Sequence, residues 1–390
     1  MSSKQFNSSL DYIYHLERMS DDFNLDNIKK FLLAIDNPQK KLKAVHIAGT
    51  NGKGSVCYMI QQSLIANGYK TGMFTSPHLV KFNERIRINN KLISNKDVDR
   101  LTNKIKLISK KKKITLTFFE TITIMAYLYF LENKVDFAVI ETGLGGKLDA
   151  TNTCKPIVTV ITKISKDHQE TLGHTIKDIS EKKSGIIKKR VPIITANKWS
   201  ALRVIKKQAE QKQAPLIIAR KRKLGLKGYL KENAEVAYAA CEELMLNNIE
   251  ESIKAAKWPG RLDRRGNIIL DCAHNPDGAK ALAKTLKAEK IKIDYVICGF
   301  MRKTQAEKVS RQFRKLKPKK GFIITKPDMT TAKPISESIK YFKKKNTITT
   351  PDLKTAIKYA EEKLKKEKNE GKILITGSIF LVGEAIKIIS

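Results

Sequence analysis

The sequence predicts an α/β protein: a P-loop-type domain on a mainly parallel sheet, followed by a smaller doubly wound, Rossmann-like domain. Three observations predict this fold class. The length of 390 residues is more than one ordinary core needs but suits two. From residue 43 onward, short apolar runs alternate with amphipathic segments of helical length, which is the pattern of βαβ units. A strand, a glycine-rich turn and a helix follow one another at residues 45–67.

In the first domain, expected at residues 1–258, strands are predicted where apolar and β-branched residues cluster between turn signals. These strands are Ala44–Ala48, Thr71–Phe74, Phe137–Glu141, Ile157–Thr162, Pro192–Thr195 and Pro215–Ile218. Helical spacing of apolar residues predicts helices at Lys53–Asn67, Phe118–Glu132 and Ile176–Lys188. The longest apolar run, near Ile122 to Leu131, is too short to span a bilayer and is expected to form a buried helix.

The second domain, expected at residues 259–390, begins at Pro259-Gly260, a pair that stops helices and forms turns. Its predicted strands lie near Ile268–Asp271, Tyr295–Gly299, Gly321–Thr325 and Ile373–Thr376. Between them, helices are predicted at Gly278–Ala288, Gln305–Lys315, Ile335–Lys343 and Leu353–Lys365. Strands alternating with helices predict a doubly wound sheet.

The formal net charge of +37 would ordinarily favour a nucleic-acid partner. The basic residues are mostly lysines spread over the whole chain, without interleaved aromatic residues on which bases could stack. We therefore expect solvated lysine faces and no nucleic-acid or membrane partner. The five cysteines are widely spaced and form no CxxC pair, and the N-terminus lacks the pattern of a secretory signal. Together these features predict a cytoplasmic protein.

The clearest motif lies at residues 45–55, where an apolar strand runs into Gly49-Thr50-Asn51-Gly52-Lys53-Gly54-Ser55. Glycines let backbone N–H groups approach phosphate oxygens, and a helix N-terminus favours negative charge. Lys53 adds a positive charge for the terminal phosphates. The spacing differs from GxxxxGK[ST], because Gly54 separates Lys53 from Ser55. Such a turn can be purely structural, but the lysine and serine within it favour nucleotide binding.

Three further residues follow predicted strands and offer metal-ligand chemistry: Ser76, Glu141 and His168. Ligands bind at the carboxyl edge of an open α/β sheet. Magnesium prefers hard oxygen donors, so Glu141 and Ser76 are apt ligands and His168 a less usual one. Each residue alone could be an ordinary loop residue, but their joint placement favours a metal site.

Two more segments carry candidate ligand contacts. Gly143 to Asn152 directly follows Glu141 and is too rich in glycine for a helix interior, so we expect a tight loop that touches ligand. In the second domain, Arg261, Asp271 and His274 provide a phosphate-binding fork, an acceptor for ribose hydroxyls and an imidazole.

Taken together, these segments resemble the folylpolyglutamate synthase/dihydrofolate synthase family of the Mur ligase superfamily, over nearly the whole chain. The resemblance is carried by NPQKKLKAVHIAGTNGKGS (37–55), TGMFTSPHLVKFNERIRIN (71–89), LTFFE (116–120), ETGLGGKLDATN (141–152), DHQETLGHTI (167–176), KSGIIK (183–188), WPGRLD (258–263), DCAHNPDGAKALA (271–283) and ITGSIFLVGEA (375–385).

The resemblance implies an ADP-forming ligase that phosphorylates a carboxylate with ATP and then lets the amine of glutamate displace phosphate. The carboxylate would belong to dihydropteroate or to the glutamate tail of a reduced folate, and the enzyme would act as a monomer. The implied catalytic residues are Lys53, Lys183 and His274.

The resemblance also assigns binding residues. ATP would contact residues 49–55 together with Asn233, Arg261 and Asp271. Two magnesium ions would be bound by Ser76, Glu141, His168 and Lys183, the last as a carbamate formed with carbon dioxide. The incoming glutamate would lie near Arg85, His274 and Ser378, and dihydropteroate near Thr117, Phe119, Asp149 and Ala150.

The sequence departs from the family pattern at three places. Lys182 replaces an acidic neighbour of Lys183, Leu230 replaces a common glutamine, and a DKD motif is absent from residues 300–304. Two alternatives stay open. One is a Mur-type amide ligase for another carboxylate and amino acid, since the phosphate loop and metal residues would be shared across the superfamily; the segments LTFFE and GLGGKLDATN argue against it. The other is a P-loop ATPase or basic nucleic-acid-binding module, which a salt-dependent interaction with DNA would support.

Overall fold

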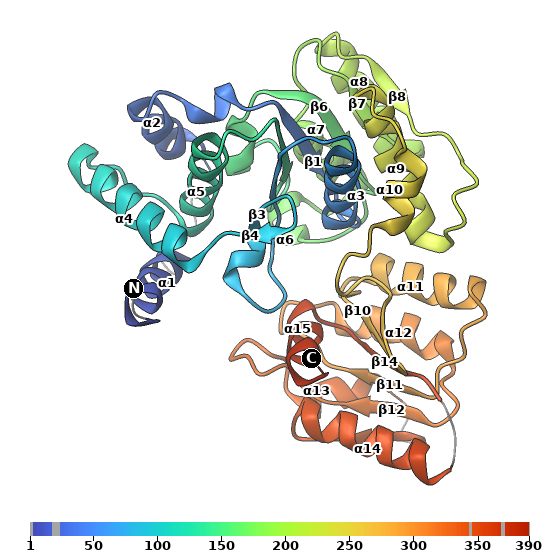
Figure 1. The fold of residues 1–390 in the computed structure, drawn as a ribbon. Coiled ribbons are helices and arrows are strands. Elements are labelled where there is room, and N and C mark those ends of the chain that lie inside the picture. Colours follow the sequence, from blue (N-terminus) through green and yellow to red (C-terminus); the bar gives the residue numbers. More distant parts are fainter. Residues whose placement is uncertain (1–2, 18–23, 343–344, 368–370, 390) are drawn as a thin grey trace. The chain divides into compact units, whose positions relative to one another are not determined.

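A computed structural model describes residues 3–17, 24–342, 345–367 and 371–389. The chain divides into two compact units (Figure 1), one of residues 1–224 and 233–256 and the other of residues 225–232 and 257–390. Helix α9, Gly228–Glu243, begins in the second unit and continues in the first.

The first unit is built on an eight-stranded sheet in the order β4-β3-β2-β5-β1-β6-β7-β8. The strands are β1 Ala44–Ala48, β2 Thr71–Phe74, β3 Ile86–Ile88, β4 Lys91–Leu92, β5 Phe137–Glu141, β6 Pro156–Ile161, β7 Ile193–Thr195 and β8 Leu216–Ile218. Only the pairings of β3 with β2 and of β4 with β3 are antiparallel. In register, Ile47 pairs with Glu141 and Ala48 with Ile161, so β5, β1 and β6 end together at one edge of the sheet.

Helices cover the first sheet because its strands are apolar on both sides. The helices of this unit are α1 Ser3–Glu17, α2 Asp26–Ala34, α3 Lys53–Ala66, α4 Asn95–Lys112, α5 Phe118–Glu132, α6 Gln169–Leu172, α7 Ile176–Ser184, α8 Trp199–Gln211, most of α9 and α10 Ile249–Ala255. Short 3-10 turns are η1 Pro38–Lys41, η2 Phe82–Arg85 and η3 Ala150–Thr153. The largest core packs α1, α2, α4 and α5 against β-strand residues such as Ala44, Phe74 and Ile140.

The second unit has a six-stranded sheet in the order β13-β12-β11-β14-β10-β9. Its strands are β9 Asp263–Arg265, β10 Ile268–Asp271, β11 Tyr295–Cys298, β12 Gly321–Ile324, β13 Thr347–Thr349 and β14 Ile373–Thr376, with only β9 antiparallel to its neighbour. The helices are α11 Pro276–Ala288, α12 Ala306–Phe313, η4 Arg314–Leu316, α13 Ile335–Ser338, η5 Ile339–Tyr341, α14 Leu353–Lys366 and α15 Ile379–Ile389.

The connections of the second sheet reverse direction at β14. The crossover through α11 runs from β10 toward β11, whereas the crossover through α14 runs back from β13 to β14. Because such crossovers are right-handed, α11 and α14 lie on opposite faces of the sheet. The carboxyl ends of β10 and β14, which are neighbours, therefore flank a switch point of the kind where ligands bind in open α/β sheets.

The predicted α/β class is confirmed, and the predicted strands agree with the observed ones to within a residue or two at each end. Three helices were predicted too long, among them α12, which ends at Phe313 and continues as the 3-10 turn η4. Helix α7 ends at Ser184 with Gly185 as its C-cap, and a Cβ on Gly185 would be only 2.4 Å from the Cβ of Lys147. Helix α13 ends at Ser338 and continues as the 3-10 turn η5; the expected end at residue 343 lies outside the described residues.

The expected buried helix is α5, whose apolar run from Ile122 is almost wholly inside the core. In the described part of the chain, no helix combines the length and apolar composition that crossing a bilayer requires.

Candidate active site

The turn between β1 and α3 is shaped by Gly52, which has a left-handed φ of 91°. A Cβ at this position would lie 2.2 Å from Oδ1 of Asn233 on α9, so only glycine fits. Lys53, Gly54 and Ser55 form the first turn of α3, where N–H groups have no partner within the helix. The positive end of the helix dipole adds to them. This turn is therefore suited to bind an anion such as phosphate.

The two residues before Gly52 hold the turn in shape with their own backbone. The N–H groups of Thr50 and Asn51 donate to the carbonyl of Lys163, at 2.9 and 3.2 Å. The Thr50 hydroxyl donates to the carbonyl of Ser165 at 3.1 Å and accepts from its N–H, while the Asn51 amide donates to its hydroxyl. Because these two backbone N–H groups are already used, the anion-binding donors are those of the first turn of α3.

Glu141, at the end of β5, joins the turn to the segment after β2. Its Oε1 lies 3.7 Å from Nζ of Lys53, and its Oε2 accepts from the N–H of Ser76 at 3.2 Å. The side chains of Lys53 and Glu141 are 15% and 5% exposed, so their charges are weakly screened by solvent. The sheet register thus brings together a cation, a carboxylate and a serine.

These groups fit a magnesium ion in part. Ser55 is buried, and its Oγ has no hydrogen-bond partner, so one hard oxygen donor in the first turn of α3 is unused. His168, by contrast, is more than half exposed, with Nδ1 3.9 Å from Oε1 of Glu170. Among the described residues, no three His, Cys, Asp or Glu side chains form a metal-binding group. A magnesium ion at Glu141 would therefore depend on waters and phosphate oxygens for most of its ligands.

Lys183, in the last turn of α7, lies against the same turn. It is 4% exposed, and its Nζ donates to the carbonyl of Gly49 at 2.7 Å. Burial, reinforced by the positive charge of Lys53, lowers the pKa of Lys183 to about 7. A large fraction of this amine is therefore neutral near neutral pH, unlike that of an exposed lysine.

The glycine-rich segment after β5 is held by the buried carboxylate of Asp149. Oδ2 accepts from the N–H of Leu144 at 2.8 Å, and Oδ1 accepts from both the N–H and the hydroxyl of Thr151. Burial raises the pKa of Asp149. The Thr151 hydroxyl in turn lies 2.8 Å from Nε2 of His46 on β1. Both Asp149 oxygens are thus engaged within the protein, and the residue fixes the shape of this loop.

Thr117 and Phe119 stand at the start of α5, and the Phe119 ring faces the same loop. A Cβ on Gly143 would lie 2.5 Å from the Phe119 ring, so ring and loop backbone are in direct contact. The Thr117 hydroxyl caps α5 by accepting from the N–H of Glu120 at 3.2 Å, and the Glu120 carboxylate accepts from the N–H of Thr117. Ala150 is buried at the start of η3.

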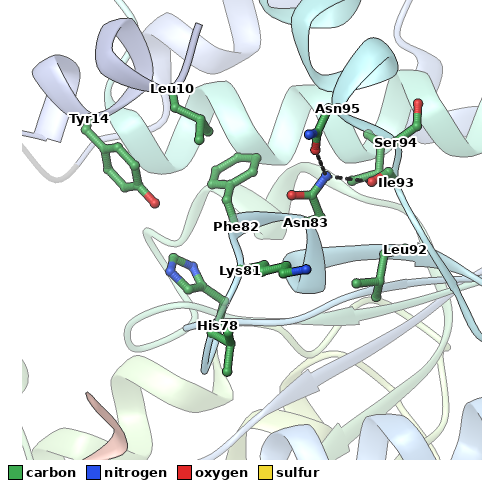
Figure 2. A pocket seen from close by; sticks show the side chains of 11 residues that line it. Leu10, Tyr14, His78, Lys81, Phe82, Asn83, Leu92, Ile93, Ser94 and Asn95 are labelled. Carbon is green, nitrogen blue, oxygen red and sulfur yellow. Dashed lines mark hydrogen bonds between the residues drawn. The ribbon is translucent and has the colours of Figure 1, made fainter. Parts of the chain in front are cut away.

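Arg85 contacts His78, which lines a cavity of about 560 Å³ formed by α1, the segment 78–83 and residues 92–95 (Figure 2). Its Nε donates to Nδ1 of His78 at 2.9 Å, and its guanidinium lies 5.3 Å from the centre of the Phe118 ring. Tyr14 stacks on the same Phe118 ring, with the two ring centres 5.7 Å apart. Arg85 is only 8% exposed, so its charge is held close to aromatic surface.

The second unit places its candidate residues at the ends of β10 and β14. Asp271 is buried, and its carboxylate accepts from the N–H groups of Leu262 and Ala273, each at 3.0 Å. His274 has Nδ1 2.9 Å from the carbonyl of Cys272. Ser378 is buried, and its Oγ accepts from the N–H of Phe380.

Comparison with known proteins finds a match to one domain family in each half of the chain. Residues 47–235 match the Mur ligase middle domain, and residues 257–388 match the dihydrofolate synthetase C-terminal domain. The chain is 31% identical to the probable dihydrofolate synthetase of Schizosaccharomyces pombe, over 92% of this chain and 96% of that protein. It is 37% identical to the dihydrofolate synthase/folylpolyglutamate synthase of Bacillus subtilis, over 67% and 72%.

The chain belongs to the dihydrofolate synthase/folylpolyglutamate synthase family. Folylpolyglutamate synthase of Mycobacterium tuberculosis, solved in complexes with ADP and AMPPCP, has the same fold, with a TM-score of 0.88 and 27% identity over 99% of each chain. The resemblance seen in the sequence is thereby confirmed, and with it the class of ATP-dependent ligase.

Several residues that shape the site of this ligase were not predicted: His46, Thr151, Lys163, Ser165 and Tyr229, whose hydroxyl donates to the Asp271 carboxylate. His46 carried a signal, because a histidine inside the apolar strand Ala44–Ala48 must be buried with a partner. Burial lowers the pKa of His46 to about 3, so the ring is neutral. The other four act through backbone or hydroxyl groups, and no local pattern marks them individually, although Thr151 lies in the predicted loop at residues 143–152.

Proposed function

We propose that this ligase joins the amino group of glutamate to the carboxyl group of dihydropteroate, of the glutamate tail of a reduced folate, or of both, releasing ADP and phosphate. The observation that carries the proposal is the grouping of Lys53, Glu141 and Lys183 around one anion-binding turn. Phosphoryl transfer to a carboxylate depends on positioning and on neutralising charge. The Lys53 ammonium, the Glu141 carboxylate and the partly neutral amine of Lys183, at a helix N-terminus, supply groups for positioning the reactants and for neutralising their charge.

In this proposal, the triphosphate of ATP lies on the first turn of α3. The N–H groups of residues 53–55 and the ammonium of Lys53 would hold its oxygens, and Gly49, Thr50, Asn51 and Gly52 would keep the turn in shape. Asn233, which contacts Gly52, and Arg261 and Asp271 in the second unit complete the proposed nucleotide contacts. The ADP and AMPPCP complexes of the Mycobacterium tuberculosis relative support a nucleotide of this kind.

Two magnesium ions are proposed, held by Ser76, Glu141, His168 and Lys183. Bound magnesium would neutralise the phosphate oxygens during transfer. The buried Glu141 carboxylate suits this ion. Lys183 suits it only as a carbamate, because an ammonium cannot ligate a cation; the lowered pKa supports this modification, since carbon dioxide reacts with the neutral amine.

The proposed reaction has two steps. A carboxylate oxygen of the acceptor attacks the γ-phosphorus of ATP, the bond to the β-phosphate oxygen breaks, and ADP leaves. The amine of glutamate then attacks the acyl carbon, phosphate leaves, and the amine loses a proton as the amide forms. Arg85, His274 and Ser378 are proposed to receive the glutamate, with His274 among the catalytic residues.

Dihydropteroate is proposed to lie near Thr117, Phe119, Asp149 and Ala150. The Phe119 ring touches the backbone of Gly143 and provides an apolar surface for a pterin. Since both carboxylate oxygens of Asp149 are used within the loop, its proposed role is to hold the surface on which the substrate lies.

The experiment is incorporation of labelled glutamate that depends on ATP and magnesium, with dihydropteroate and a reduced folate offered separately and ADP and phosphate counted. Incorporation into both acceptors, with one ADP for each amide, establishes a bifunctional enzyme, and incorporation into one assigns a single activity. If ATP is hydrolysed but neither acceptor forms product, the folate substrate is wrong.

We also propose that the enzyme acts as a cytoplasmic monomer on small-molecule substrates. The five cysteines are all unpaired and buried, which suits a reducing compartment. Sedimentation of the purified protein over a range of concentrations tests the monomer.

A further inference from the structure

The carboxylate of Asp271 is held by three donors. Oδ2 accepts from the hydroxyl of Tyr229 and from the N–H of Leu262, and Oδ1 accepts from the N–H of Ala273. The residue is 3% exposed. An ionised carboxylate has about four acceptor positions, so the three donors leave one position, on Oδ1, for a further hydrogen bond.

Tyr229 reaches Asp271 from a fixed backbone. Its N–H donates to the hydroxyl of Thr285 on α11 at 3.2 Å. The preceding Gly228 has a left-handed φ of 56°, and a Cβ there would lie 2.0 Å from the Thr285 hydroxyl. The following Leu230 packs on the core of the second unit. The start of α9 is thus docked on α11, and the tyrosine has little freedom to take its hydroxyl elsewhere.

The hydroxyl is the only side-chain donor among the three. The two backbone donors approach opposite oxygens of the carboxylate, so each alone tolerates some rotation about the bond between Cβ and Cγ of Asp271, a torsion with a broad minimum. The tyrosine adds a second donor to Oδ2 and, being bonded to an ionised group, makes one of the stronger kinds of hydrogen bond. Together the three donors fix the rotation of the carboxylate, with two hydrogen bonds on Oδ2 and one on Oδ1.

We propose that Tyr229 is a positioning residue of this ligase: its hydroxyl orients the Asp271 carboxylate so that Oδ1 accepts a hydrogen bond from a ribose hydroxyl of the nucleotide. The inference rests on the proposed function, in which Asp271 contacts ATP. It also implies discrimination between nucleotides, because a carboxylate held in this orientation binds nucleotides that have the ribose hydroxyl more tightly than those that lack it.

The test is calorimetric titration of the full-length protein with ADP, 2′-deoxy-ADP and 3′-deoxy-ADP, without folate or glutamate. The wild type is expected to bind ADP more tightly than at least one of the deoxy nucleotides. Tyr229→Phe is expected to weaken ADP binding about tenfold, the usual worth of a hydrogen bond to a charged group, while the disfavoured deoxy nucleotide loses little. In the Asp271→Asn background, adding Tyr229→Phe should have no further effect.

Tyr341→Phe is the matched control, because Tyr341 packs on the core of the same unit and is not part of the proposed nucleotide contacts; ADP binding should be unchanged. A role for Tyr229 in stability alone would weaken all three nucleotides equally, and that result overturns the inference, as does unchanged discrimination in Tyr229→Phe. Wild-type protein that binds ADP but extends no folate leaves this test intact and rejects only the folate substrate. Wild-type protein that does not bind ADP rejects both.

Discussion

Replacing Lys183 with methionine should remove a rise in the free energy of unfolding that the wild type shows between about pH 7 and pH 10. Burial lowers the pKa of Lys183 from 10.5 to about 7 in the folded protein. Between these values the unfolded chain binds a proton that the folded chain does not, so the stability of the wild type rises with pH by about 1.4 kcal/mol per pH unit. Below about pH 7 both states hold the proton, and the slope from this residue vanishes.

The measurement is denaturant unfolding of the first unit in buffer free of metal ions and carbon dioxide, at about pH 7, 8 and 9. The stability difference between wild type and Lys183→Met should move in favour of the wild type by about 2 to 3 kcal/mol across this range. The slope depends only on the difference in protons bound by the folded and unfolded states, so other losses in Lys183→Met, such as packing around the side chain, shift the difference equally at every pH. Lys182→Met is the control, because Lys182 is the exposed neighbour and its difference should stay flat.

A flat difference for Lys183→Met would refute the reasoning, because the amine would then be charged in the folded protein. The expected slope has a chemical counterpart. At about pH 7.5, a lysine of pKa about 7 is neutral in about three quarters of the molecules, against about one in a thousand for an ordinary lysine. Labelled carbon dioxide should therefore give a carbamate signal in wild-type protein that is absent from Lys183→Met.

Three further predictions concern the turn and α5. Gly52→Ala should weaken ADP binding by at least about tenfold, since the new Cβ meets Asn233; Gly68→Ala, also at positive φ but with open space around it, should cost only about 1 kcal/mol of stability and leave binding intact. Thr117→Ala removes the cap of α5 and should lower the free energy of unfolding by about 1 kcal/mol, while Thr117→Ser should restore most of it. Lys53→Ala should lower kcat by about a hundredfold or more with an unchanged circular dichroism spectrum, because it removes the cation at the phosphates; near-normal turnover would remove Lys53 from the mechanism.

Most strands of the two sheets could be predicted from the sequence because buried parallel strands are almost wholly apolar, but the short strands β3, β4, β9 and β13 were not predicted. The runs Ala44–Ala48 and Phe137–Glu141 have the same ends in the structure as in the prediction. Helix α4, Asn95–Lys112, was not predicted. Its buried stripe of Val98, Leu101 and Ile105 is separated by lysines and polar residues, so the mean hydropathy of the segment is low although the helical spacing is present.

Site residues could be predicted only where the order of the strands alone brings them together. Lys53, Ser76 and Glu141 follow neighbouring strands, and parallel strands end at one edge of a sheet, so their proximity follows from the strand order. The burial of Lys183 does not, because a chain with 76 lysines and arginines offers no local mark for the one that lies against Gly49. Likewise, the saturation of the Asp149 carboxylate depends on the folded path of its own loop.

The outermost strands of both sheets are short. Strand β4 has two residues, and β8, β9 and β13 have three each. An exposed sheet edge can recruit a strand from another molecule, and the attraction grows with the number of backbone groups that the edge presents. Edge strands of two or three residues can form only a few backbone hydrogen bonds with a strand from a neighbouring molecule. Charged residues lie on two of these edges, Lys91 on β4 and Asp263, Arg264 and Arg265 on β9. The described sheets are thus poorly suited to seed fibrils, which favours a chain that stays dispersed when crowded.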